Sequence, residues 1–564
     1  MPGWLKNPLW LFLLITGVYL LAIPVDIMEV DSAQYFSMSR EMMERGDYLH
    51  VYDRGSEYLD KPPFIFWISS LFFALFGVNE FAFKIPSILF SLLGIYATYR
   101  FTLIYYSRQT AILAALIIAT TQGYFHFNND IRTDTYLTNS VITAVWMISE
   151  HLRSPRWYWW ITGFVFIGVA MLAKGPLGLM APLLAFGTHI LAKKQWKFIF
   201  KWEWLAGAAI TGLVLLPMVI GLYEQFDMHP EKLVNGKTGV SGLRFFFWEQ
   251  SFGRITGENV WKNDSGPLFF VHNLAWSFLP WSLVFFLAFA RMIKELILSP
   301  ADAIKSRPEW ISAGGFLLPF IALSASSYKL PHYIYVTFPF AAVIAADFLI
   351  KISLPDTRFR SKWLNVSQSI VLFLCWVFGG IIFTWFFPLV NPILIVVALT
   401  GFTLLAIISF RKFKRPLDKI VAMSVSSALA FNILMATHFY PSVLNYQASA
   451  HLGKDALEMK LPLDRLYIFL VNGRSMDVYT RHSYALISLS ELDVKLGLYP
   501  EVFVHTNPEG LLQLKAAGYD CSIFLERKSY PVTQLSLNFA NPATRESVLE
   551  DRFILRVSRL KPGI

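Results

Sequence analysis

Long, unbroken runs of hydrophobic residues follow one another along most of the chain. About twenty apolar residues are needed for a helix to cross a bilayer, so each long run predicts one membrane span. Thirteen such runs lie near residues 8–25, 82–104, 109–127, 134–151, 157–173, 176–192, 202–222, 267–290, 310–325, 333–350, 364–387, 391–410 and 418–437. The runs are continuous rather than alternating, which predicts a polytopic helical protein and not a barrel.

One further apolar run, residues 64–76, is too short to cross and is predicted to be an interfacial or re-entrant segment. With the N-terminus inside, every short basic loop falls on the cytoplasmic side, as the positive-inside rule requires. The odd number of spans then places the C-terminus outside. The first span lacks a small-residue cleavage site and is expected to be a retained helix.

The pattern changes after about residue 438. Short apolar runs at 466–471, 484–489, 501–505, 521–525 and 553–557 alternate with turns, and a helical stretch covers 510–517. We therefore expect two parts: a membrane domain over 1–437, and a small soluble α/β domain over 438–564 on the extracytoplasmic side.

Composition supports a membrane protein. The 564 residues are 55% hydrophobic and only 16% charged, whereas soluble domains carry about 25% charged residues. The net charge of +10 is explained by cytoplasmic loops, so no nucleic-acid partner is needed. The two cysteines, Cys375 and Cys521, lie far apart, which indicates neither a disulfide framework nor a Cys-type metal site.

The loops on the predicted outer side carry acids and bases together. The first of them, residues 26–81, holds Asp26, Glu29, Asp31, Arg54, Glu57, Asp60 and Lys61. The others add Asp130, Arg132, Asp134, Lys174, Lys232, Lys237, Arg244, Glu249, Arg254, Lys329 and His332. Any one of these residues alone is more often a helix cap or a snorkelling anchor than a ligand. Five loops that all present such groups near the membrane surface favour a polar site.

The residue types indicate a chemistry. Lysine and arginine bind phosphate, and a carboxylate beside them can orient or remove an acceptor proton. Loops 26–81 and 223–266, the second with the aromatic run 245–248, would cover a cavity fed from the lipid phase. Together these features fit transfer of a group from a lipid-linked phosphate. A lipid-linked sugar flippase is the alternative, although charges within the spans are scarce and no repeat is evident. A non-catalytic subunit of an envelope complex also remains open.

Several motifs resemble the aminoarabinose lipid A transferases, which are GT-C glycosyltransferases related to the protein O-mannosyltransferases. In chain order they are Asp31-Ser32-Ala33-Gln34-Tyr35, Asp60-Lys61-Pro62-Pro63, Arg132-Thr133-Asp134, Lys174-Gly175-Pro176, Phe247-Trp248-Glu249 with Arg254, and Lys329-Leu330-Pro331-His332. The resemblance covers essentially the whole membrane part. It implies a mostly α GT-C fold with about 13 transmembrane helices and a small C-terminal extracytoplasmic α/β domain.

The resemblance also implies roles. Asp31 corresponds to the catalytic acid of the first loop, Asp134 to a second acidic residue, and Lys61 and Arg254 to groups that hold the donor phosphate. Further cavity candidates are Tyr35, Tyr58, Asp60, Arg132, Lys174, Glu249, Lys329 and His332. The implied reaction moves a sugar, 4-amino-4-deoxy-L-arabinose or a relative, from a polyprenyl phosphate with inversion. The implied location is the outer face of a bacterial inner membrane.

The chain departs from the family pattern at three positions. Ser32 stands where glutamate is usual, Gln34 where arginine is frequent, and Asp60 where glutamate commonly precedes Lys-Pro-Pro. Some members hold a divalent metal near this cavity, but no ligand set can be assembled here, so a metal stays open. Lipid A is one candidate acceptor; another glycolipid, a polysaccharide precursor or a protein hydroxyl are the alternatives.

Overall fold

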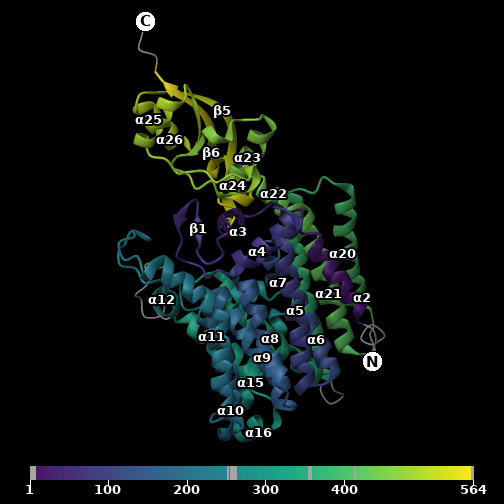
Figure 1. Ribbon diagram of the computed structural model, residues 1–564. Coiled ribbons are helices and arrows are strands. Elements are labelled where there is room, and N and C mark those ends of the chain that lie inside the picture. Colours follow the sequence, from purple (N-terminus) through teal and green to yellow (C-terminus); the bar gives the residue numbers. More distant parts are fainter. Residues whose placement is uncertain are drawn as a thin grey trace.

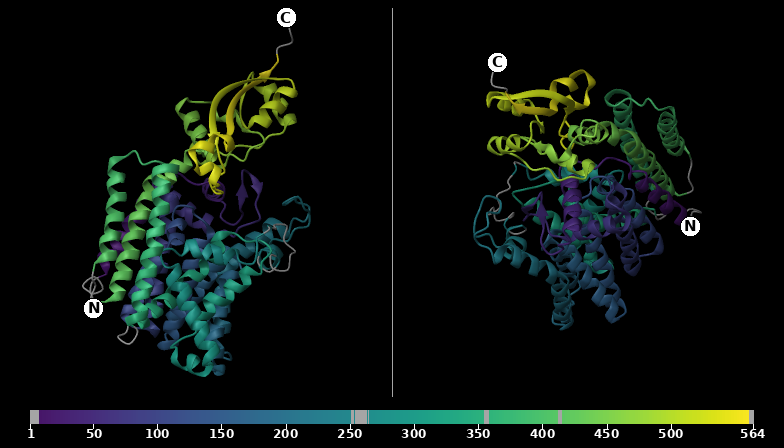
Figure 2. Two further views of the ribbon diagram at one scale, coloured as in Figure 1. Left: turned by 180° about the vertical axis from the view of Figure 1, so that it is seen from behind. Right: turned by 45° about the horizontal axis from the view of Figure 1, so that its top comes forward.

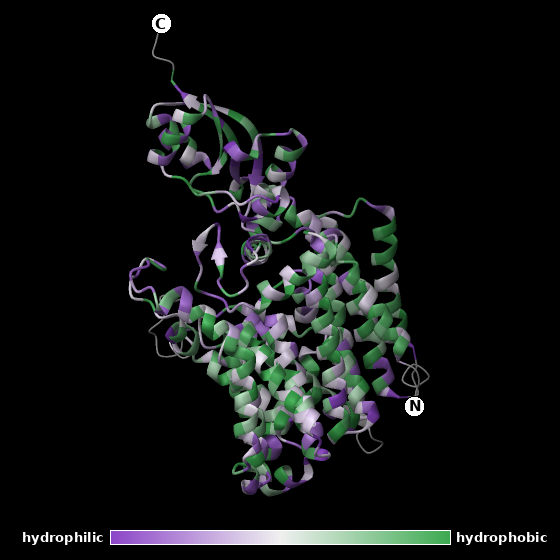
Figure 3. Ribbon diagram, in the orientation of Figure 1, coloured by the Kyte–Doolittle hydropathy of each residue, from purple (hydrophilic) through white to green (hydrophobic). Residues whose placement is uncertain are grey.

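A bundle of helices with a small α/β unit at one end makes up the molecule (Figure 1). The computed structural model describes residues 8–250, 253, 263, 265–353, 358–411 and 415–560, without the side chains of 358–361. Apolar residues fill the helical bundle, while polar residues collect at its two ends and over the α/β unit (Figure 3). This distribution is the one a bilayer requires of a bundle that crosses it.

Helices lie along each of the thirteen predicted runs. In chain order they are α2 (Leu9–Leu20), α5 (Glu80–Tyr105), α6 (Arg108–Ala119), α7 (Gln122–Phe127), α8 (Thr133–Arg153), α9 (Trp157–Lys174), α10 (Leu177–Ala192), α11 (Glu203–Leu222), α14 (Phe269–Ser277), α15 (Ser282–Leu298), α17 (Ile311–Ser324), α18 (Phe338–Ile352), α19 (Arg358–Ile381), α20 (Pro392–Phe410) and α21 (Pro416–Leu434). The runs 109–127 and 267–290 are each divided into two helices. The second break contains Pro280, which has no amide hydrogen to continue the helical ladder.

Seven helical segments in the described part of the chain are long and apolar enough to cross a membrane. Five shorter apolar helices, including α2 and α4 (Phe64–Phe76), fall below that length. The predicted mostly helical, multi-pass fold is confirmed, and the count of thirteen spans stays a prediction. The last of the seven continues through α22 (Tyr440–Leu444), beyond the boundary predicted at residue 437.

Loop 26–81, which is predicted to lie outside, is folded rather than open. It contains α3 (Asp31–Arg45), the hairpin of β1 (Tyr52–Asp53) and β2 (Ser56–Glu57), and α4. Gly46 adopts a φ of 66° after α3, a conformation that glycine tolerates and that ends the helix. Both α3 and the hairpin lie between the bundle and the α/β unit (Figure 1). This placement puts Asp31, the first residue of α3, at the junction of the two parts.

The C-terminal unit contains a four-stranded mixed sheet with the order β3-β4-β6-β5. Its strands are β3 (Leu466–Ile468), β4 (Val502–Thr506), β5 (Tyr519–Ser529) and β6 (Glu550–Arg559), with only the β3–β4 pair parallel. Figure 2 shows the sheet from two further sides. The run 484–489 forms no strand: Leu486 makes an isolated bridge to Ile468 instead.

Both faces of this sheet are covered. Along β4, Val502 and Val504 belong to one apolar cluster and Phe503 belongs to another, as the two-residue period of a strand requires. The helices of the unit are α23 (Ala448–Glu458), α24 (Arg474–Thr480), α25 (Leu489–Leu498), α26 (Pro508–Ala516), α27 (Leu537–Ala540) and α28 (Pro542–Arg545). The predicted helical stretch 510–517 corresponds to α26. The α/β unit therefore has a core of its own.

The predicted topology can be tested with reporters. Alkaline phosphatase fused after Arg559 should be active, because this enzyme folds only outside the cytoplasm and an odd number of spans places the C-terminus there. The same reporter fused after Lys194, in a predicted cytoplasmic loop, should be inactive. An inactive C-terminal fusion that is present at normal levels would contradict the thirteen-span arrangement.

Candidate active site

An ionic network surrounds Asp31. Nη1 of Arg132 donates to Oδ2 of Asp31, while Nε of the same guanidinium donates to Oδ2 of Asp130 at 2.6 Å. The Asp31 side chain is 36% exposed, whereas that of Asp130 is only 6% exposed. One arginine therefore joins a buried acid to an accessible one. The accessible carboxylate keeps a face that a substrate can reach.

Ser32 and His126 complete the surroundings of Asp130. Oγ of Ser32 donates to Oδ1 of Asp130 at 2.8 Å, and Nε2 of His126 lies 3.8 Å from Oδ2. Burial by itself raises the pKa of Asp130, but Arg132 and His126 hold that pKa below its ordinary value. Asp130 is therefore charged, and it fixes the guanidinium that in turn orients Asp31.

A second ion pair lies at the ends of two neighbouring helices. Because three residues join α8 to α9, the two helices run antiparallel, and the start of α8 meets the end of α9. Nζ of Lys174 lies 2.5 Å from Oδ1 of Asp134, with both side chains at most 9% exposed. An acid in the first turn and a base in the last turn also suit the two helix dipoles.

Two residues from the 331–333 segment border this pair. Nε2 of His332 lies 3.6 Å from Oδ2 of Asp134, and Nζ of Lys174 lies 4.0 Å from the ring centroid of Tyr333. The cations Arg132, Lys174 and Lys61 all lie within electrostatic range of His332. These contacts make the two ion pairs and Lys61 parts of one charged region.

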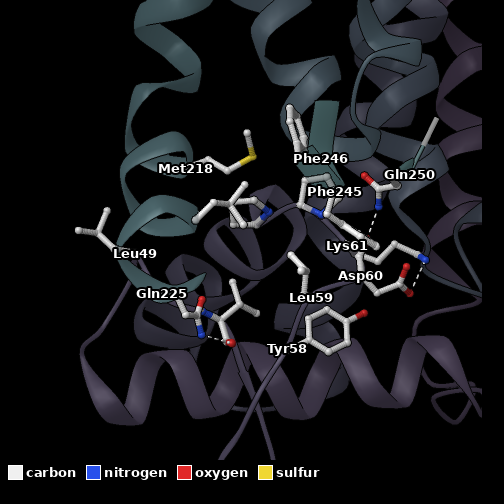
Figure 4. A pocket seen from close by; sticks show the side chains of 14 residues that line it. Leu49, Tyr58, Leu59, Asp60, Lys61, Met218, Gln225, Phe245, Phe246 and Gln250 are labelled. Carbon is white, nitrogen blue, oxygen red and sulfur yellow. Dashed lines mark hydrogen bonds and ion pairs between the residues drawn. The ribbon is translucent and has the colours of Figure 1, made fainter. Parts of the chain in front are cut away.

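Lys61 lines a pocket between loop 26–81, the end of α11 and the part of loop 223–266 that contains residues 225–250. Nζ of Lys61 donates to Oδ2 of Asp60 at 2.6 Å, and Nε2 of Gln250 donates to the main-chain oxygen of Asp60. Figure 4 shows Asp60 and Lys61 together at one side of this pocket. Most of the remaining lining is apolar and includes Leu49, Leu59, Met218, Leu222, Phe245 and Phe246. The pocket therefore combines an apolar wall with one cationic, polar edge.

Two tyrosines connect this pocket with Asp31. The rings of Tyr35 and Tyr58 contact Phe66 at centroid distances of 5.9 and 6.1 Å. Burial, together with the negative charges of Asp31 and Asp60, raises the pKa of both phenols well above its ordinary value. Both hydroxyls are therefore neutral and able to donate hydrogen bonds. Since each phenol senses both carboxylates, Asp31 and Asp60 lie in one neighbourhood.

The remaining candidates are Lys329, Glu249 and Arg254. Nζ of Lys329 donates to the main-chain oxygen of Ser265 at 3.0 Å, and Glu249 pairs with Arg244 at 3.4 Å. Arg254 lies outside the described residues. The structure thus brings Asp31, Lys61, Arg132, Asp134, Lys174 and His332 together with Tyr35, Tyr58 and Asp60. The contacts with Ser265 and Arg244 place Lys329 and Glu249 next to residues of loop 223–266.

The sequence motifs assigned no role in the site to Asp130, Ser32, Gln225 or Gln250. Asp130 stands two residues before Arg132, so its proximity in the chain was a signal for the ion pair. Gln225 donates from Nε2 to the main-chain oxygen of Val51 at 2.9 Å and accepts from Val51 N at 3.1 Å. No local pattern indicates that a glutamine would bind a backbone 174 residues away.

A metal does not fit the described site. Among the residues that the structure describes, no group of three or more His, Cys, Asp and Glu side chains could hold an ion. Asp60 forms an ion pair with Lys61, and Asp134 forms one with Lys174. The carboxylates of this region are thus neutralised by cationic side chains.

The chain adopts the GT-C fold of membrane-bound glycosyltransferases. Its structure matches that of ArnT from Cupriavidus metallidurans bound to undecaprenyl phosphate with a TM-score of 0.73, at 17% sequence identity, over 97% of this chain and 98% of that one. The family model described as dolichyl-phosphate-mannose-protein mannosyltransferase matches residues 60–220. The resemblance to aminoarabinose lipid A transferase-like GT-C proteins is therefore confirmed.

Two curated relatives carry the name undecaprenyl phosphate-alpha-4-amino-4-deoxy-L-arabinose arabinosyl transferase. Transferase 2 of Proteus mirabilis is 24% identical over 352 residues, which are 61% of this chain and 59% of that protein. The Pseudomonas aeruginosa (strain LESB58) protein is 26% identical over 312 residues, which are 54% of this chain and 52% of that protein. The chain thus spans little more than half the length of these two relatives.

The buried pair between Lys174 and Asp134 gives a stability prediction. Lys174→Ala should lower the free energy of unfolding by about 3–5 kcal/mol, because it leaves a buried carboxylate without its cation. The double change Lys174→Met with Asp134→Leu should cost less, because it removes both charges. Equilibrium unfolding in mixed micelles measures both effects.

Arg291→Ala is the control for this experiment. Arg291 pairs with Glu295 at 2.7 Å within one helix, and the two side chains are 38% and 36% exposed. Its removal should change the unfolding free energy by at most about 1 kcal/mol. Equal losses for Lys174→Ala and Arg291→Ala would show that burial of the Asp134 pair adds nothing to its contribution to stability.

Proposed function

We propose that this protein is a membrane glycosyltransferase that takes a sugar from a polyprenyl phosphate. The observation that carries the proposal is the pocket with an apolar wall and Lys61 at its polar edge, next to the region of Asp31. A polyprenyl tail fits the apolar wall, and a lysine ammonium binds a phosphate as a point charge. The fold match with ArnT bound to undecaprenyl phosphate supports the same donor class.

The reaction is a single displacement at the anomeric carbon. An acceptor hydroxyl attacks this carbon opposite the phosphate, the bond from carbon to phosphate oxygen breaks, and the configuration inverts. Asp31 takes the acceptor proton or anchors the acceptor, while Lys61 stabilises the negative charge that grows on the departing lipid phosphate. Arg254 is assigned to the same phosphate from its place in the family motif.

The neighbouring groups have supporting roles in this scheme. Arg132 holds Asp31 in place through its second contact with Asp130. The neutral hydroxyls of Tyr35 and Tyr58 can donate to sugar or phosphate oxygens between the two carboxylates. Asp134, Lys174 and His332 contact one another and share a charged region with Lys61, so they keep this end of the bundle polar.

The proposed donor is undecaprenyl phosphate-linked 4-amino-4-deoxy-L-arabinose or a related sugar, and the proposed acceptor is lipid A or another envelope molecule. The names of the curated relatives support this donor. The proposed location is a bacterial inner membrane with the site facing the periplasm. In that setting residues 1–437 form the membrane domain, loops 26–81 and 223–266 cover the site, and residues 438–564 form the periplasmic domain.

Removal of the base tests the mechanism. Purified Asp31→Asn should lose transfer by about 10²–10⁴-fold, because the amide cannot accept the acceptor proton. The assay reconstitutes the protein in nanodiscs with the lipid-linked aminoarabinose donor and lipid A, and follows the product by mass spectrometry. Turnover close to wild type in a folded Asp31→Asn protein would reject the role of Asp31.

Removal of the phosphate ligand tests donor binding. Lys61→Ala should raise the KM for the donor by about 10–100-fold, since a hydrogen bond to a charged group contributes about 1.5–3 kcal/mol. Lys237 is an exposed lysine of loop 223–266. Lys237→Ala is the matched control and should leave this KM unchanged. Identical donor kinetics for the two variants would exclude Lys61 from the phosphate site.

A further inference from the structure

The C-terminal unit contacts the chain immediately before Asp31. Gln447 donates from Nε2 to the main-chain oxygen of Ile27 at 2.8 Å and accepts from Glu29 N at 2.8 Å. Its side chain thus binds the backbone on both sides of Met28, much as a neighbouring strand would. Gln447 is 2% exposed, so water cannot readily replace these bonds.

Helix α24 of the same unit holds this segment from a second side. Oε1 of Glu29 accepts hydrogen bonds from Ser475 N at 2.8 Å and from Ser475 Oγ at 2.5 Å. Tyr479 accepts at its hydroxyl from Ile27 N at 2.8 Å. The backbone that leads into Asp31 is therefore fixed by residues from the other end of the chain.

The hairpin that leads to Lys61 is held by α24 as well. Arg54 donates to both carboxylate oxygens of Asp477, at 2.6 and 2.9 Å, and these side chains are 6% and 0% exposed. Arg474 binds both oxygens of Asp53, which also accepts from Gln34 Nε2 at 2.8 Å. Asp53 thus links α24, the hairpin and the first turn of α3.

We propose that the C-terminal unit positions the reacting groups, with Gln447, Arg474 and Asp477 as positioning residues for transfer. The inference rests on the proposed function. Its physical basis is that the buried contacts of the unit converge on the two segments that carry Asp31 and Lys61. Since a displacement of about 1 Å can cost about 10²-fold in rate, two loops held against one rigid helix keep the site productive.

Kinetics of the full-length protein in nanodiscs test this proposal. Gln447→Ala and Arg474→Ala should each lower kcat by about 10–100-fold. Gln447→Ala, which acts on the segment before Asp31, should change the donor KM by less than about threefold. Arg474→Lys, which keeps the charge, should recover part of the loss. The loss in Asp53→Ala combined with Arg474→Ala should be smaller than the product of the two single losses, because both changes remove the same Arg474–Asp53 contact.

Arg527→Ala is the matched control. Arg527 pairs with Asp455 at 2.8 Å within the C-terminal unit, and its side chain is 52% exposed. This variant should keep the wild-type kcat. Wild-type kcat in Gln447→Ala and Arg474→Ala would overturn the proposal, and so would a loss of activity that is matched by a loss of folded protein.

Hydrogen exchange separates this proposal from the proposed function. Amides of residues 26–35 and 52–61 should exchange faster in Gln447→Ala and Arg474→Ala than in Arg527→Ala. If the wild-type protein transfers no sugar, the proposed function fails, and the exchange data still decide whether the C-terminal unit fixes these loops. Unchanged exchange in both variants would overturn the positioning role.

Discussion

The pairing of charges at the edge of an apolar bundle is the constraint on which the site depends. An ion loses several kcal/mol when it leaves water, and the loss is recovered only through a close partner of opposite charge. Arg132 between Asp31 and Asp130, and Lys174 beside Asp134, both meet this requirement. These pairs allow polar chemistry next to apolar helices.

The bundle supplies these partners through the ends of its helices. Asp134 lies in the first turn of α8 and Lys174 is the last residue of α9, so the short connection between these antiparallel helices brings them together. Asp31 begins α3, where its carboxylate also suits the positive end of the helix. Charges at helix ends can reach the polar face of the molecule while the helices themselves remain apolar.

Loop 26–81 depends on contacts with other parts of the chain for its fold. Its hairpin has only two residues in each strand, too few for a stable independent structure. It is held instead from two sides: by Gln225 and Lys232, both bonded to Glu57, and by Arg474 and Asp477 of α24. This loop carries Asp60 and Lys61, and its shape depends on two other regions. The geometry of the site therefore depends on the fold of the whole chain.

The sequence by itself determined the helical membrane part, the α/β composition after residue 438 and the loops where acids and bases gather. These features can be predicted because the length of an apolar run and the charge of a loop are properties of short segments of the chain. The sequence also supplied the motifs that contain Asp31, Lys61 and Asp134. It missed the shape of loop 26–81, since two-residue strands leave no periodic signal. It also gave no sign that the apolar run 484–489, unlike the other runs of this part, forms no strand.

Only the tertiary structure decided which charges meet. Arg54 binds Asp477 across 423 positions of the chain, and Gln447 binds the backbone of Ile27 across 420. Asp130 rather than Asp134 turned out to share Arg132 with Asp31, although both acids are two residues from that arginine. The partner of a charged side chain depends on which helix ends and loops come within a few ångströms, and that is set by the packing of the entire bundle.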